Sequence, residues 1–168
     1  KNYTWDGVGH NLDERSLVPI TTDFEMDSSL PEAVAKLNAD PNYRKMFKAA
    51  FGDENITGEK ILKAISQFMA TMISADSKYD RMKKGNAVFT AEENQGMALF
   101  QNKCAACHSG DLFTDESYRN TGMYYNTQFG DRGRYRVTLD WNDNMKFRVP
   151  SLRNVEYTAP YMHDGRFY

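Results

Sequence analysis

A Cys-x-x-Cys-His motif constrains the fold and chemistry of this chain more than any other feature. Cys104 and Cys107 are the only two cysteines among the 168 residues, and His108 follows directly. Thiols at this spacing can form thioether bonds with the two vinyl groups of one porphyrin, and the adjacent imidazole can then bind the iron. The motif therefore predicts one covalently attached haem c, with His108 as the proximal iron ligand.

Other interpretations of the cysteine pair fit the sequence less well. A four-cysteine zinc site or a disulfide framework needs a second pair, which the chain lacks. A thioredoxin-like redox pair is expected beside a β-α-β pattern, and none surrounds Cys104. A chance match to the motif is the remaining alternative.

The overall composition predicts neither a nucleic-acid partner nor a membrane span. The formal net charge is −2, so no basic footprint for nucleic acid or an anionic membrane is present. No apolar run is long enough to predict a transmembrane span. Hydrophobic residues make up 40% of the chain, slightly few for a globular protein, and a buried porphyrin would supply further apolar surface. Because haem c is attached outside the cytoplasm, we expect that a leader peptide was removed or left out of the sequence.

The first half of the sequence predicts helices joined by short loops. One helix is expected to start at Ser29 or Leu30, and a second to run from Pro41 to a stop at Gly52. A third follows Thr57, where apolar residues from Ile61 to Ile73 recur at three- and four-residue steps. This stripe predicts core packing, and we therefore expect a mainly α fold.

The segment 83–86 is the expected boundary between two lobes. Just after it, Thr90 and Glu93 form a capping box that opens a helix leading into the haem motif. Beyond His108 the chain is rich in glycine and has little periodicity, which suggests irregular backbone wrapped on a haem. The alternation from Tyr135 to Leu139 predicts a short strand.

Segments on both sides of the haem motif resemble bacterial di-haem cytochrome c peroxidases and the related enzyme that matures methylamine dehydrogenase. The first half follows the family pattern at Trp5-Asp6-Gly7 and at Glu25-Met26, and Pro19 also matches it. The resemblance implies that 1–85 is the helical remainder of a first, peroxidatic domain, and that 86–168 is a cytochrome c-like electron-transfer domain. The matching C-terminal segments are 96–100 (GMALF), 131–134 (DRGR), 147–155 (FRVPSLRNV) and 158–165 (TAPYMHDG).

The family pattern continues beyond both ends of this sequence. Family members carry an earlier Cys-x-x-Cys-His motif, whose haem reacts with peroxide, and they extend past the His-Asp-Gly motif. We therefore expect an internal fragment, weakly active or inactive by itself, of a protein with a second haem. The sixth ligand of the retained iron, methionine in the peroxidases and tyrosine in the maturation enzyme, is expected beyond Tyr168. Within the sequence, Met123, Met145 or Met162 could also bind the iron.

The resemblance implies catalytic roles for three residues of the first half. Trp5 matches the tryptophan that carries electrons between the haems, and Glu25 matches the glutamate that moves a proton on bound peroxide. Arg15 stands where the family usually has glutamine, and it could pair with Glu25 or stabilise a developing oxyanion. Without the resemblance, Glu25 would be interpreted as a solvated charge and Trp5 as a half-buried interface residue.

Two further sites come from the C-terminal motifs. Thr158 and Pro160 match positions whose backbone carbonyls help to hold a calcium ion between the domains. His163 matches a histidine near the second haem, and a hydrogen-bonded loop histidine is an equally good interpretation. His10 has no family counterpart and is expected on the surface.

Together these matches imply a periplasmic enzyme, a cytochrome c peroxidase that reduces hydrogen peroxide to water. Its electrons would come from a small protein of the cytochrome c or cupredoxin type, and they would enter at the haem of this chain. Two alternatives remain: a maturation-type enzyme that oxidises a protein substrate through Trp5, and a mono-haem electron carrier. The protein could also form a homodimer, which the sequence does not decide.

Overall fold

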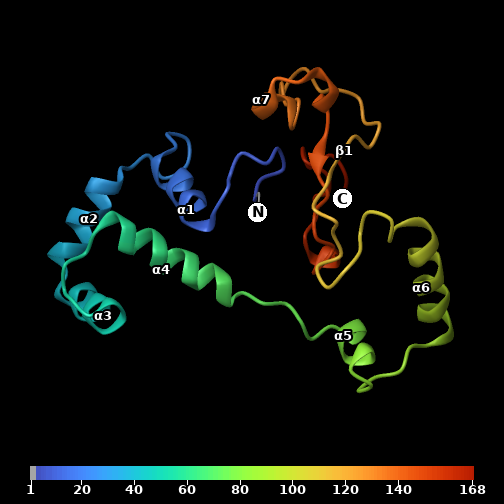
Figure 1. Ribbon diagram of the computed structural model, residues 1–168, viewed down its shortest axis with the longest axis horizontal. Coiled ribbons are helices and arrows are strands. Elements are labelled where there is room, and N and C mark those ends of the chain that lie inside the picture. Colours follow the sequence, from blue (N-terminus) through green and yellow to red (C-terminus); the bar gives the residue numbers. More distant parts are fainter. Residues whose placement is uncertain (1–2) are drawn as a thin grey trace. The chain divides into compact units, whose positions relative to one another are not determined.

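The computed structural model describes residues 3–168, and these form two compact units (Figure 1). The first unit contains Tyr3 and Gly9–Ile73, and the second contains Thr4–Val8 and Ser74–Tyr168. The chain thus divides between Ile73 and Ser74, ahead of the segment 83–86 at which the sequence predicted the boundary. The short stretch around Trp5 also belongs to the second unit. The fold is mainly α, as predicted.

The first unit consists of four helices whose ends are set by local signals. Ser29 and Glu32 form a capping box, and Gly52 ends its helix with a left-handed φ of 88°. The hydroxyl of Thr57 accepts a hydrogen bond from the Lys60 amide and caps the longest helix. The three predicted helices are therefore confirmed, and a further one precedes them. The helices are α1 (Leu12–Thr21), α2 (Leu30–Ala39), α3 (Pro41–Phe51) and α4 (Gly58–Thr71).

The core of the first unit lies between α2, α3 and the start of α4. Phe47, Ile56 and Ile61 are its buried residues, and Ile65 packs against them. The predicted stripe on α4 is buried only in this half. Phe68, near the end of α4, is 65% exposed, and Ile73, which follows the helix, is 79% exposed, because neither belongs to the core cluster.

The second unit combines short helices with much irregular backbone. The predicted strand at Tyr135–Leu139 is wrong, because the amide of Leu139 bonds back to the carbonyl of Tyr135 and closes a helical turn. The two strands pair antiparallel, with Arg119 opposite Phe147. The elements are α5 (Lys78–Lys83), α6 (Ala91–Lys103), β1 (Tyr118–Arg119), α7 (Tyr135–Thr138) and β2 (Phe147–Arg148), with 3-10 turns at Trp141–Asp143 and Val155–Tyr157.

The haem motif lies at the C-terminal end of α6, as predicted. The capping box of Thr90 and Glu93 opens the helix, and the amide of Cys104 closes it on the carbonyl of Phe100 at 2.8 Å. The amide of His108 then bonds to the carbonyl of Cys104 at 2.9 Å. The motif is thus a compact turn anchored on a helix, which fixes its three functional side chains relative to one another. No helix of the described chain is long and apolar enough to cross a membrane.

Candidate haem-binding site

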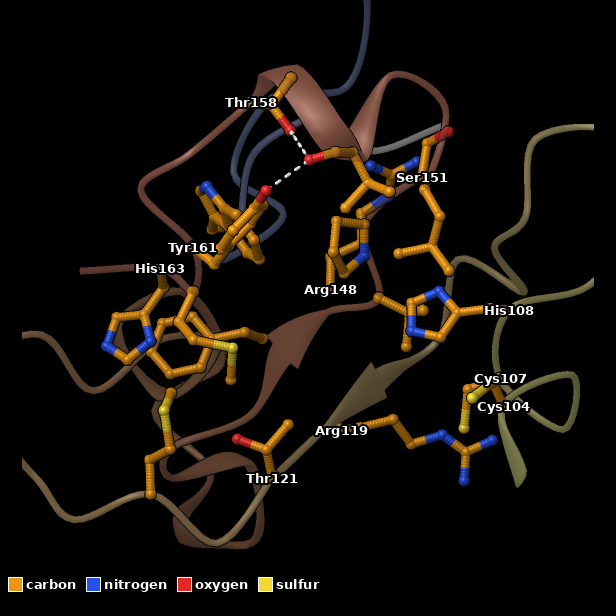
Figure 2. A pocket seen from close by; sticks show the side chains of 18 of the residues that line it. Cys104, Cys107, His108, Arg119, Thr121, Arg148, Ser151, Thr158, Tyr161 and His163 are labelled. Carbon is orange, nitrogen blue, oxygen red and sulfur yellow. Dashed lines mark hydrogen bonds between the residues drawn. The ribbon is translucent and has the colours of Figure 1, made fainter. Parts of the chain in front are cut away.

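The second unit contains a pocket of about 540 Å³ that is lined by the Cys-x-x-Cys-His motif. Figure 2 shows His108, Cys104 and Cys107 on one side of this pocket, with His163 and Tyr161 on the other. The segment 147–152 contributes the wall between these two sides. Residues far apart in the sequence therefore meet around one cavity.

The ring of His108 is oriented by a backbone carbonyl. Its Nδ1 lies 3.0 Å from the carbonyl oxygen of Phe113. Because a carbonyl only accepts hydrogen bonds, Nδ1 carries the proton and the lone pair remains on Nε2. Metal-binding histidines commonly donate their second nitrogen in this way, which fixes the ring and makes the binding nitrogen more basic. His108 is therefore prepared to bind a metal through Nε2.

The two cysteines are free thiols at the same pocket. Cys104 is exposed and Cys107 is partly buried, and both side chains line the cavity. No cluster of three or more His, Cys, Asp or Glu side chains that could hold a bare metal ion is found within residues 3–168. Two thiols and one imidazole at an apolar cavity suit covalent attachment of a porphyrin and binding of its iron.

Two buried nitrogens on the pocket wall lack a partner. Arg148 Nε and His163 Nδ1 are buried side-chain atoms without a hydrogen bond to any described residue. Both side chains line the pocket, and Arg148 Nη2 lies 3.6 Å from Glu116 Oε1. A buried guanidinium nitrogen without an acceptor is costly, whereas a bound group with carboxylates would satisfy it. A porphyrin carries two such propionate groups, so these residues fit a haem as well as the thiols do.

His163 is buried in the pocket wall. Its ring stacks on Phe147 with centroids 3.7 Å apart, and its side chain is 4% exposed. Its Nε2 lies 4.0 Å from an Asp164 carboxylate oxygen. Hydrogen bonds from Arg166, and secondarily the charge of His163, hold the pKa of Asp164 below its usual range.

Trp5 also lines this pocket, although it lies far from the motif in the sequence. The amide of Arg148 donates to the carbonyl of Trp5 at 2.7 Å. Arg134 Nη1 donates to the carbonyls of Asp6 and Gly7 at 3.2 and 3.3 Å. These bonds attach the tryptophan segment to the rest of the second unit and hold Trp5, which is 42% exposed, in the lining of the pocket.

The methionines proposed as sixth ligands lie in different surroundings. Met123 and Met162 line the pocket, and Met162 has a left-handed φ of 71°. Met145 is 6% exposed and is not part of the lining. The pocket therefore retains two of the three thioethers as candidates.

Glu25 and Arg15 are residues of the first unit and do not line the pocket. Glu25 is exposed in the turn that follows α1, and its amide donates to the Thr22 carbonyl at 3.1 Å. Arg15 lies on α1 with its stem against Gly9, where an added Cβ would be 2.2 Å from Arg15 Cδ. Their catalytic roles stay predictions.

Thr158 and Pro160 line the pocket, and the bond between Ala159 and Pro160 is cis. The hydroxyl of Thr158 donates to the carbonyl of Val155 at 3.5 Å. The calcium role of these two positions stays a prediction. His10 is exposed in the loop before α1, as expected.

Sequence reasoning missed Phe113 and Arg148 as residues of the site. Arg148 lies inside a recognised motif but carried no assigned role, and only its burial against the pocket reveals one. Phe113 follows the motif by five positions, and no sequence signal shows that its carbonyl faces His108.

Comparisons with known proteins agree with the motif. A family model described as di-haem cytochrome c peroxidase matches residues 1–88. The chain is 35% identical over 168 residues to the methylamine utilization protein MauG of Methylorubrum extorquens, covering 98% of this chain and 47% of that protein. It is 36% identical over 165 residues to the cytochrome c551 peroxidase of Nitrosomonas europaea, covering 96% of this chain and 49% of that protein.

A solved structure of similar fold is that of a MauG-like protein associated with microbial copper homeostasis. The TM-score is 0.89 at 33% identity, over 98% of this chain and 55% of that chain. The chain thus spans about half the length of the curated relatives and of the structure that it matches.

Proposed function

Because the chain belongs to the di-haem cytochrome c peroxidase family, we propose that it is part of a periplasmic enzyme that reduces hydrogen peroxide to water. The haem held at Cys104, Cys107 and His108 would be the one at which electrons enter. A small redox protein of the cytochrome c or cupredoxin type would supply these electrons. The peroxide would be reduced at a second haem, bound by a part of the protein outside this sequence.

The orientation of His108 is the observation that carries the proposal. Its Nδ1–H is committed to the Phe113 carbonyl at 3.0 Å, and its Nε2 is left to bind iron beside two free thiols. When bound, the haem would supply a reversible one-electron change of its iron. The thiols of Cys104 and Cys107 would anchor it covalently, and Arg148 would meet the negative charge of a propionate.

Trp5 is the proposed route for electrons out of this pocket. Trp5 lies in the pocket wall and is also 42% exposed, so its indole could contact the haem on one side and a second group on the other. An indole suits this role because it is polarizable and can hold a transient cation radical. Arg148 holds the backbone of Trp5, and Arg134 holds the backbone of the next two residues. These bonds would limit changes in the distance between Trp5 and the haem.

Glu25 would serve the second haem as the group that moves a proton on bound peroxide. Its exposed position in the first unit supports this assignment, because a carboxylate in water can reach a substrate bound by another part of the protein. Arg15 would assist there by pairing with Glu25 or with a developing oxyanion. Thr158 and Pro160 would contribute backbone oxygens to a calcium ion.

A maturation-type enzyme that oxidises a protein substrate through Trp5 is the second candidate. The chain is 35% identical to a methylamine utilization protein and 36% identical to a cytochrome c551 peroxidase. The nearly equal sequence identities support this second candidate. The residue downstream of His163 that binds the iron separates the two: methionine would indicate a peroxidase and tyrosine a maturation enzyme. A full-length gene with a single Cys-x-x-Cys-His motif would instead indicate a mono-haem electron carrier.

The deciding experiment compares peroxide turnover per haem of the full-length protein with that of residues 1–168. Both should be produced in a host that attaches haem c. We expect the full-length protein to reduce peroxide and the shorter chain to exchange electrons but to turn over peroxide poorly, because Glu25 then lacks its iron. Equal rates per haem would contradict the proposed division of labour between the two haems.

A further inference from the structure

The loop that orients His108 has an unfavourable backbone conformation. Phe113 has a φ of 53°, in the left-handed region that bulky residues rarely adopt. Its carbonyl is the acceptor for His108 Nδ1. Such a conformation persists only when the surroundings hold it. The contacts that hold Phe113 therefore also determine how firmly the His108 ring is placed.

The ring of Phe113 is enclosed by three side chains. Tyr79 of α5 and Phe100 of α6 contact it edge-on, with centroids 5.0 and 5.8 Å away. The guanidinium carbon of Arg153 lies 5.6 Å from the ring centroid on another side. Phe113 is thereby packed between two helices and one arginine of a distant segment.

The segment 149–153 forms hydrogen bonds with the loop 111–114, which contains Phe113. Arg153 Nε donates to the carbonyl of Asp111 at 2.6 Å, and Ser151 Oγ donates to the carbonyl of Leu112 at 2.6 Å. Thr114 Oγ1 donates in return to the carbonyl of Val149 at 2.6 Å. These three bonds flank Phe113 on both sides, so the loop cannot relax its left-handed residue without breaking them.

Arg153 is itself fixed by a carboxylate on α5. Its Nη1 and Nη2 each donate to an oxygen of Asp80 at 2.9 Å, and the two side chains are only 15% and 10% exposed. The amide and the hydroxyl of Ser77 also donate to Asp80, at 2.9 and 2.8 Å. A paired, bidentate guanidinium has little freedom to move.

We propose that Asp80 and Arg153 are positioning residues for the axial ligand, and that they act through Phe113. The pair holds the loop 111–114, the loop holds the Phe113 carbonyl toward His108, and this hydrogen bond sets the donor strength of Nε2 toward the iron. The inference rests on the proposed haem attachment. It adds that the reduction potential of this haem depends on a salt bridge that does not line the pocket.

The test uses the full-length, haem-loaded protein with the variants Arg153→Lys and Asp80→Asn. Arg153→Lys keeps the positive charge but loses the fork and the Nε–H, so it separates geometry from charge. The control is Arg81→Gln, which removes the exposed ion pair between Arg81 of α5 and Asp76. That pair has no hydrogen bond to the loop.

We expect both test variants to retain covalent haem and to raise the reduction potential of this haem, because a loosened Nδ1–H bond makes Nε2 a weaker donor. The double variant should shift the potential no further than a single one. The control should leave the potential unchanged.

Wild-type potentials in both variants would overturn the inference. If Arg153→Lys does not fold, the nearly isosteric Asp80→Asn decides the question alone. The absence of covalent haem from the wild-type protein is a different result, and it would overturn the proposed function itself.

Discussion

The amide of Arg148 donates a 2.7 Å hydrogen bond to the carbonyl oxygen of Trp5, and this bond joins two segments that lie far apart in the sequence. Arg148 lies on β2, and its side chain lines the pocket together with the indole. Arg148 therefore lines the candidate haem pocket with its side chain. Its backbone amide also binds Trp5, the residue proposed to carry electrons from this pocket. A haem at this pocket and Trp5 would keep a fixed separation.

Replacement of Trp5 by alanine should slow electron transfer between the haems of the full-length protein and leave both haems attached. The indole would be lost from the pocket wall, while the backbone bond to Arg148 can persist. Stopped-flow oxidation of the reduced enzyme by peroxide measures this transfer. The control is Trp141→Ala, since Trp141 is the other tryptophan, is 64% exposed and does not line the pocket. Equal slowing by both replacements would contradict a specific role for Trp5.

Replacement of Gly7 by alanine should destabilise the second unit more than the same change at Gly85. Both glycines have left-handed φ values, 81° and 78°, so both pay about 1 kcal/mol for the added Cβ. At Gly7 that Cβ would also lie 1.9 Å from Tyr118 Oη, whereas at Gly85 no atom lies within 4 Å. Urea unfolding of the two variants gives the difference in free energy of unfolding. Equal losses would show that the Trp5 segment is not packed as described.

The wild-type protein should carry one haem on Cys104 and Cys107 when it is made in a host that attaches haem c. Mass spectrometry of a peptide spanning the motif should show the added haem mass, and Cys104→Ala/Cys107→Ala should show none. His108→Gly should keep the thioether bonds but change the iron spectrum, because the proximal ligand is lost. An unmodified wild-type peptide, or zinc bound at this motif, would refute the site.

Replacement of Glu25 by alanine should lower peroxide turnover of the full-length protein by roughly a hundredfold, the range for loss of a general acid–base group. Asp23→Ala, in the same acidic run, is the matched control and should keep most of the activity. Steady-state assays with a reduced electron donor measure both. Near-normal turnover after loss of Glu25 would remove it from the mechanism.

Acid should remove the stabilising effect of the Asp80–Arg153 pair. Hydrogen bonds from Arg153, followed by those from Ser77, hold the pKa of the Asp80 carboxyl below its usual range. A carboxyl whose pKa is lowered on folding stabilises the protein above its unfolded value of about 4, and this contribution is lost as the pH falls below that value. The unfolding temperature of Asp80→Asn should therefore lie below that of the wild type at pH 7, and the gap should shrink toward pH 3. A gap that is constant with pH would contradict this origin.

Features that depend on only a few neighbouring residues, such as helix caps and the haem motif, could be predicted from the sequence alone. The caps at Ser29, Gly52, Thr57 and Thr90 are each closed by groups within a few residues, so the helix starts and stops were predictable. The Cys-x-x-Cys-His motif is local in the same sense, because its chemistry depends on the spacing of its own side chains. The strand predicted at Tyr135–Leu139 was wrong, since alternation over only five residues does not distinguish a strand from one helical turn.

The amino-acid sequence by itself determined that this chain carries a haem motif at the end of a capped helix, and it indicated the family. Only the tertiary structure decided what surrounds that motif. Trp5, Arg148 and His163 come to one pocket through contacts between distant segments, and such contacts have no local signature. The left-handed Phe113 that orients His108 depends on Arg153 and Asp80 in the same way. Local hydrogen bonds are encoded by neighbouring residues, whereas the wall of a pocket depends on how the whole unit packs.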